Sequence, residues 1–195
     1  MESFPAFFPL TGRRVVIAGA GEFADAKAAL FDGSPAEVVR LAGARAMDAN
    51  LYRGAVLAFV ACDDEEACRA AAQAARGAGV PVNVVDRPEL CDFFTPALVD
   101  RGEVVAAVGT GGASPVLAQQ LKREIEASVP EGTGRVAALL RQFRQETLGV
   151  FPDMAERRVF IQDLLSGPAA EAALAGDMEG AEALVRAALD AVSRP

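Results

Sequence analysis

The stretch RVVIAGAGEFA, at residues 14–24, decides the fold. Its first half is a run of β-branched and small apolar residues without polar alternation, which is typical of a strand buried on both faces of a sheet. The run ends at Gly19, and residues 22–30 then predict a helix that stops before the Gly-Ser-Pro sequence at 33–35. A strand, a glycine turn and a helix in this order indicate the first unit of a doubly wound α/β fold.

The turn between this strand and helix matches the pattern G-x-G-x-x-A. Gly19 allows the tight turn, Gly21 lets the backbone approach a pyrophosphate, and Ala24 keeps the helix close to the sheet. Backbone N–H groups at the start of the helix would then face the phosphates. The turn therefore predicts a dinucleotide site, and the alternative is a glycine turn that binds nothing.

The second strand, expected at residues 37–41, lacks the acidic residue that usually binds the ribose. Residues 41–44 read LAGA, between Arg40 and Arg45. Since these arginines could tolerate a 2′-phosphate, the sequence leaves the choice between NAD and NADP open.

Further strands are predicted at residues 55–61, 80–85 and 104–108, with a helix at 63–78; helices follow at 114–127, 134–147, 153–165 and 168–192. This alternation followed by helices predicts a parallel α/β domain at residues 1–112 and a helical region after it. The short segment between the strands at 37–41 and 55–61 predicts a shortened edge of the sheet. There we expect a vestigial edge strand at 45–47 and only a short helical turn at 48–53.

Composition limits the location, the partners and the chemistry that the protein can have. No apolar run reaches the roughly 18 residues of a membrane helix, and the first residues lack a signal-like pattern, so we expect a cytoplasmic protein with no membrane partner. The net charge of −8 argues against nucleic acid. Three cysteines without any histidine match no zinc spacing and no disulfide framework, so no bound metal is expected. Acid–base chemistry near neutral pH then falls to Asp, Glu, Lys, Tyr or Cys.

A series of segments occurs in a characteristic order: FPAFFPL at 4–10, GAG at 19–21 with Lys27 in the helix, NVVD at 83–86, DFFTPA at 92–97, VDR at 99–101 and VGTGGASPVLA at 108–118. This series resembles the precorrin-2 dehydrogenase/sirohydrochlorin ferrochelatase family, including the N-terminal module of siroheme synthase. The resemblance spans residues 4–165, and its specific part is the stretch 83–118.

The resemblance implies a Rossmann-like NAD-binding domain at 1–112, a helical dimerisation region at 113–150 and a small helical C-terminal domain at 151–195. It also implies a homodimer that binds a tetrapyrrole near the subunit junction. The implied reaction is NAD-dependent oxidation of precorrin-2 to sirohydrochlorin. Insertion of ferrous iron, as a substrate, is a second activity that the residues leave open.

Asp86 is the catalytic residue that the resemblance implies. It directly follows a predicted strand, at the carboxyl edge where doubly wound sheets bind ligands. Its alternative role is that of a turn aspartate before Arg87 and Pro88. The expected cofactor residues are Gly19, Gly21, Glu22, Phe23, Ala24, Ala61 and Cys62, and the expected substrate residues are Thr110, Gly111, Gly112 and Ser114.

Two departures from the family pattern keep other functions open. The segment after the second strand is short, and Thr110 stands in a GTGGASP sequence where some members have SSGGTSP. Loss of part of the pocket would suit an NAD-sensing regulatory module. It would also suit a relative that has lost NAD binding and keeps only tetrapyrrole or metal chemistry.

Overall fold

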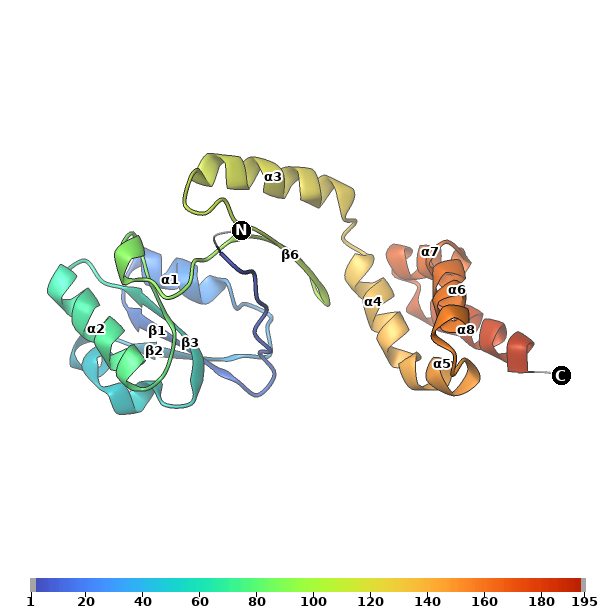
Figure 1. Ribbon diagram of the computed structural model, residues 1–195, viewed down its shortest axis with the longest axis horizontal. Helices are drawn as coiled ribbons and strands as arrows, with labels where there is room; N and C mark the ends of the chain where they lie inside the picture. Colours follow the sequence, from blue (N-terminus) through green and yellow to red (C-terminus); the bar gives the residue numbers. More distant parts are fainter. Residues whose placement is uncertain (1–2, 194–195) are drawn as a thin grey trace. The chain divides into compact units, whose positions relative to one another are not determined.

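The computed structural model describes residues 3–193 and divides the chain into two units, residues 1–95 and 96–195 (Figure 1). Among the described residues, no helix has the length and apolar character needed to span a bilayer. The three-part division expected at residues 112 and 150 stays a prediction.

The N-terminal unit is built on a parallel sheet of four strands. These are β1 (Arg14–Gly19), β2 (Glu37–Leu41), β3 (Ala55–Ala61) and β4 (Val82–Val84), in the spatial order β2-β1-β3-β4. Helices α1 (Glu22–Ala29) and α2 (Glu65–Gly77) connect them. The order and the parallel pairing confirm the predicted doubly wound, Rossmann-like fold.

Strand β1 is buried on both faces, which explains its unbroken apolar sequence. Val15 and Ile17 pack in one cluster with Ala24 of α1 and Phe59 of β3. Val16 and Ala18, which point the other way, pack in a second cluster that includes the buried alanines and Cys68 of α2. The alternate residues of the strand therefore serve two separate cores.

The shortened segment after β2 contains two 3₁₀ helices, η1 (Gly43–Met47) and η2 (Ala49–Tyr52). The expected helical turn at 48–53 is confirmed, but the edge strand expected at 45–47 is wrong. Ala46 and Tyr52 are buried in the same cluster as α2, and the Tyr52 hydroxyl donates to the Ala46 carbonyl at 2.6 Å. Since this contact folds the segment over the face of the sheet, β2 remains the edge strand.

The C-terminal unit begins with a hairpin of β5 (Ala97–Arg101) and β6 (Val104–Val108), which pair antiparallel in a sheet of their own. The strand at 104–108 was expected to belong to the parallel sheet, and this expectation is wrong. A tight turn reverses the chain at Gly102, whose N–H donates to the Asp100 carboxylate at 2.7 Å. The turn brings β6 back onto the preceding segment, which was not predicted as a strand.

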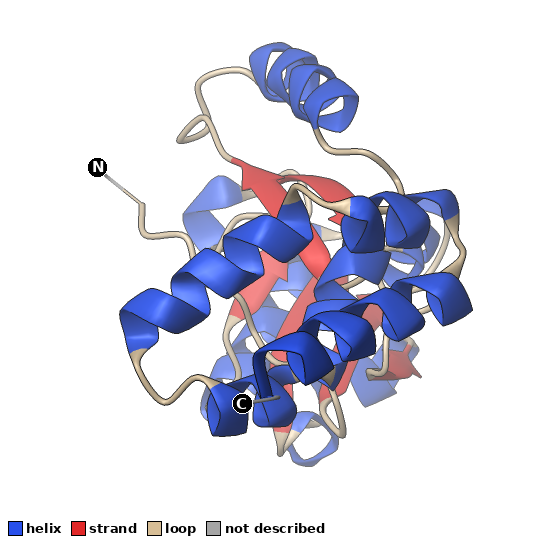
Figure 2. Ribbon diagram, turned by 90° about the vertical axis from the view of Figure 1, so that its right-hand side faces the viewer, coloured by secondary structure: helices blue, strands red, loops and turns tan. Residues whose placement is uncertain are grey.

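The regular elements described after β6 are all helices: α3 (Pro115–Ser128), α4 (Thr133–Gln142), α5 (Arg144–Val150), α6 (Met154–Leu165), α7 (Pro168–Ala175) and α8 (Met178–Ser193) (Figure 2). Two predicted helices are each divided into two. The helix expected at 134–147 breaks at Phe143, and the one at 168–192 breaks at Gly176, which has a left-handed φ of 96°. Phe143 is buried in the core of this unit with Leu139 and Val185.

Candidate active site

A pocket of about 340 Å³ opens at the carboxyl edge of the parallel sheet. Its lining comes from the start of α1 and from the segments that follow β3 and β4, namely Phe23, Ala61, Cys62, Asp63, Val85, Asp86 and Arg87. The sequence predicted four of these residues, and the fold brings them together because neighbouring parallel strands end at the same edge. Asp63, Val85 and Arg87 were missed, although each adjoins a predicted residue.

The glycine turn forms one side of this edge, and its two glycines have different surroundings. Gly19 has a φ of 126°, and a Cβ atom there would lie 1.8 Å from the carbonyl oxygen of Ala61. Gly21 has a φ of 82° and faces open space within 4 Å of where its Cβ would be. Gly19 therefore allows β1 to end against β3, whereas Gly21 leaves the backbone accessible where α1 begins. Ala24 is fully buried against the sheet, as the pattern predicted.

Asp86 is the one non-glycine residue with a positive φ, 57°, in the described part of the chain. Aspartate tolerates this left-handed conformation better than most residues, yet it still costs free energy. Such conformations persist where the surrounding structure fixes them, and they concentrate at functional sites. The preceding residue, Val85, is held because its N–H donates to the Val60 carbonyl at 2.9 Å.

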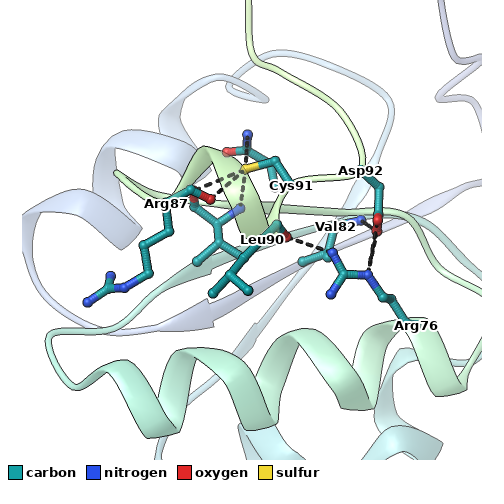
Figure 3. A network of polar contacts seen from close by, with 8 residues as sticks. Arg76, Val82, Arg87, Leu90, Cys91 and Asp92 are labelled. Carbon is teal, nitrogen blue, oxygen red and sulfur yellow. Dashed lines mark hydrogen bonds and ion pairs between the residues drawn. The ribbon is translucent and has the colours of Figure 1, made fainter.

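The chain after Asp86 is fixed by a network of polar contacts, shown in Figure 3. The Cys91 thiol accepts from the Val84 N–H at 3.2 Å and lies 3.3 Å from the Arg87 carbonyl, to which it can donate. Cys91 thus joins the two ends of the Asp86 turn. The Asp92 carboxylate accepts from the Val82 N–H at 3.0 Å, which ties the returning chain to the start of β4.

Arg76 on α2 completes this network. Its Nε donates to Asp92 at 3.0 Å, and its Nη2 donates to the Leu90 carbonyl at 2.7 Å. The loop that carries Asp86 is thus held both by its own strand and by the neighbouring helix. A fixed turn of this kind presents its carboxylate in one place, which acid–base chemistry requires.

Cys62 lines the pocket, but its thiol is not activated. Burial and the neighbouring Cys68 raise the pKa of the Cys62 thiol to about 12. Cys68 itself donates its thiol to the Cys62 carbonyl at 3.2 Å. Because the thiolate is the nucleophilic form, Cys62 does not act as a nucleophile at neutral pH and can only contact a ligand.

We predict that iodoacetamide alkylates Cys62 at pH 7.5 about 10³-fold more slowly than an unperturbed thiol, because its thiolate fraction falls tenfold for each unit by which the pKa rises. Mass spectrometry of peptides after timed labelling measures the rate, with glutathione in the same tube as the reference. The reaction should become fast only as pH approaches 12. Rapid labelling at pH 7.5 in the folded protein would contradict the assignment.

The four residues expected to bind substrate form the loop that begins α3, in the C-terminal unit. The Thr110 hydroxyl donates to the Ser114 carbonyl at 3.2 Å, and the Ser114 hydroxyl accepts from the Leu117 N–H at 3.2 Å. Ser114 is therefore the N-cap of α3. Gly111 and Gly112 both have a positive φ. The lining of the 340 Å³ pocket comes from the N-terminal unit alone, so the substrate role of this loop stays a prediction.

A larger pocket, of about 460 Å³, lies within the helical unit and was not predicted. Leucines, Phe143, Ile161 and Val185 supply most of its lining, together with Arg141, Arg144 and Arg157. Its one hydroxyl, on Thr147, donates to the Phe143 carbonyl at 2.9 Å. Because this lining holds no carboxylate or thiol, the pocket offers no acid–base group that titrates near neutral pH.

Three family models match successive parts of the chain. They are "Putative NAD(P)-binding" at residues 6–97, "Sirohaem biosynthesis protein central" at 107–128 and "Sirohaem synthase dimerisation region" at 132–189. The first covers the parallel sheet and the pocket, so this unit matches a family described as putative NAD(P)-binding. The third covers α4 to α7 and most of α8, so the chain contains a dimerisation region.

The chain is also similar to whole proteins. It is 41% identical over 212 residues to a siroheme synthase of Methylococcus capsulatus, an alignment that covers 100% of this chain and 45% of that protein. A siroheme synthase of Stutzerimonas stutzeri is 39% identical over 211 residues, with 99% and 45% covered. The chain thus spans less than half the length of these relatives. The alignments are longer than its 195 residues, so the relatives contain residues without a counterpart in it.

Among solved structures, "SirC, precorrin-2 dehydrogenase" superposes with a TM-score of 0.63 over 95% of this chain and 100% of that chain. The two sequences are 14% identical. At that identity the likeness concerns the fold, and it extends over both the sheet and the helices.

Proposed function

The chain belongs to the siroheme synthase family, whose N-terminal part it matches, and from this premise we propose that it oxidises precorrin-2 to sirohydrochlorin with NAD. The observation that carries the proposal is the position of Asp86. Asp86 lines one pocket with Phe23 of the glycine-turn helix and with Ala61 and Cys62 at the end of β3. A proton acceptor and the elements of a dinucleotide site thus occur together.

The protein backbone at the glycine turn suits a dinucleotide. Gly21 leaves open space at the start of α1, and the helix N-terminus presents N–H groups to a pyrophosphate. We propose that Gly19, Gly21, Glu22 and Phe23 hold the phosphates, that Ala24 sets the helix against the sheet, and that Ala61 and Cys62 border the remainder of the cofactor. When bound, the dinucleotide supplies the hydride acceptor, and the protein orients the reactants.

NAD is the proposed cofactor, although no acidic residue at the end of β2 selects it. Arg40 on β2 forms an ion pair with Asp25 of α1, which already engages its guanidinium. Because no acidic residue at the end of β2 selects NAD, NADP has to be tested beside it.

Asp86 is proposed as the base that accepts the proton released when precorrin-2 loses a hydride. Its place at the tip of β4 lets the carboxylate reach a ligand in the pocket, and the fixed turn holds it there. The loop of Thr110, Gly111, Gly112 and Ser114 is proposed to bind an acidic group of the substrate through backbone N–H groups. We further propose a homodimer through the dimerisation region. A cytoplasmic location stays a prediction.

The test is an anaerobic assay with precorrin-2 and either nucleotide, followed at the absorbance of the reduced nucleotide and of sirohydrochlorin. We expect both signals to rise together with NAD. Nucleotide binding without turnover would favour the sensing module instead. Sirohydrochlorin binding without binding of NAD or NADP would favour a relative that has lost the cofactor. Ferrous ion added to sirohydrochlorin, without nucleotide, tests iron insertion separately.

A further inference from the structure

Arg87 is the one basic residue in the lining of the 340 Å³ pocket, where the acidic residues are Asp63 and Asp86. Among residues 3–193 it forms no ion pair within 4 Å. In the same part of the chain its one side-chain hydrogen bond is a long one, from Nη1 to the Cys68 sulfur at 3.6 Å. A guanidinium has five N–H donors, so most of them remain available to a ligand in the pocket.

The backbone that carries this side chain is fixed. The Arg87 N–H donates to the Val84 carbonyl at 3.3 Å, and the Arg87 carbonyl accepts from the Leu90 N–H at 3.0 Å. Pro88 follows directly and further limits the conformations that Arg87 can adopt. Figure 3 shows the side chain leading away from the Cys91 network. A ligand that meets the guanidinium therefore has no main chain to order there, which lowers the cost of binding.

The position of Arg87 in the sheet separates it from the phosphate end of the proposed cofactor site. The glycine turn follows β1, whereas Arg87 follows β4, and β3 lies between these two strands. Two strand spacings amount to about 10 Å. The N–H groups of the glycine turn already offer a place for a pyrophosphate, so Arg87 faces the part of the pocket that is left for the second reactant.

An anionic reactant needs a cation in this place. The chain has a net charge of −8, and both Asp63 and Asp86 repel an anion that enters the pocket. Lys27, the cation on α1, does not belong to the lining. Its Nζ donates to the Thr95 hydroxyl at 3.1 Å and stands 5.5 Å from the centre of the Phe59 ring. Arg87 is therefore the side chain of this pocket that can attract an acidic ligand.

We propose that Arg87 binds a carboxylate of the tetrapyrrole substrate and thereby places the ring beside Asp86. This inference rests on the proposed function, because precorrin-2 and sirohydrochlorin carry the acetate and propionate groups that it requires. The planar guanidinium can donate two parallel N–H···O bonds to one carboxylate, which fixes the direction of the ligand as well as its charge. Arg87 is thus a specificity-determining residue, and the proton transfer is left to Asp86.

The test is a binding titration with sirohydrochlorin as the probe, without nucleotide. In Arg87→Gln the Kd should rise by about 10- to 100-fold, the range for loss of hydrogen bonds to a charged group, and it should become less dependent on salt. Arg87→Lys keeps the charge and loses the planar fork, so its Kd should lie between the two. The Kd for NAD, measured by calorimetry, should change by less than about twofold in both variants.

The matched control is Arg53→Gln, which removes the same charge from the same unit. Arg53 is exposed and precedes β3, at the end of that strand opposite to Ala61, and it does not line the pocket. This variant should bind sirohydrochlorin as the wild type does. A change in net charge alone would instead affect both variants equally.

Kinetics supply the second readout. In Arg87→Gln the KM for precorrin-2 should rise by a factor similar to that of the Kd, while kcat stays nearly unchanged, because the carboxylate lies away from the reacting atoms. A purely structural role of Arg87 would lower the midpoint of thermal unfolding and would leave the salt dependence of binding unchanged.

The inference is overturned if Arg87→Gln binds sirohydrochlorin as tightly as the wild type, or if the variant loses affinity for NAD instead, which would assign Arg87 to a phosphate of the nucleotide. A wild type that does not bind sirohydrochlorin overturns it as well. Failure of the proposed function is a different result, in which the wild type binds sirohydrochlorin but does not oxidise precorrin-2, and the binding titration then still decides the role of Arg87.

Discussion

Replacing Asp86 by asparagine is expected to lower the rate of precorrin-2 oxidation by about 10²- to 10⁴-fold, the range typical for loss of a positioned base. The amide cannot accept the proton, so kcat should fall much more than KM rises. Asparagine also tolerates the left-handed conformation that Asp86 adopts at a φ of 57°, so the turn should survive. Steady-state kinetics with NAD and a thermal unfolding curve measure the two effects.

The matched control for this variant is Glu89→Gln, which removes a carboxylate from the same loop. Glu89 lies in η3 (Pro88–Leu90), is exposed and does not line the pocket. Its variant should keep wild-type kcat and KM. Asp86→Asn with an unchanged kcat would remove Asp86 from the chemistry and leave it as a turn residue, which is the alternative that its sequence context allowed.

The sheet could be predicted from sequence because each strand carries a dense local signal. The bounds of β2 and β3 match the predicted 37–41 and 55–61, since short apolar runs between turn residues indicate buried strands. The break at Phe143 could not be predicted in the same way. The sequence on both sides of it favours helix, and the interruption depends on how Phe143 packs into the core with Leu139 and Val185.

The candidate site, too, could be predicted from the sequence only in part. Phe23, Ala61, Cys62 and Asp86 could be expected to meet, because strand ends in a doubly wound sheet converge on one edge. The backbone strain at Asp86 and the burial of Lys27 depend on contacts between residues distant in sequence. The Lys27–Thr95 hydrogen bond, for example, joins residues 68 positions apart. Local sequence patterns do not indicate such contacts.

Gly19→Ala should destabilise the N-terminal unit by about 3–5 kcal/mol, the sum of a forbidden backbone angle and an overpacked contact. The added Cβ would lie 1.8 Å from the Ala61 carbonyl oxygen. Gly19 and Ala61 are paired on the two central strands, so neither backbone can move aside. The midpoint of thermal unfolding should fall by about 10 °C or more. Circular dichroism, recorded without nucleotide, measures this loss independently of cofactor binding.

Gly21→Ala, two residues further on, separates folding from binding. Its backbone has a φ of 82° and a ψ of −171°, a region that essentially only glycine adopts, but an added Cβ would meet nothing within 4 Å, so only conformational strain of about 1–3 kcal/mol is expected. The methyl group would nevertheless stand where the backbone is proposed to approach a pyrophosphate, so NAD affinity should fall while most of the stability remains. Calorimetric titration with NAD measures that affinity. If both variants unfolded at the same temperature, the close approach of β1 to β3 at Gly19 would not be the constraint that the structure indicates.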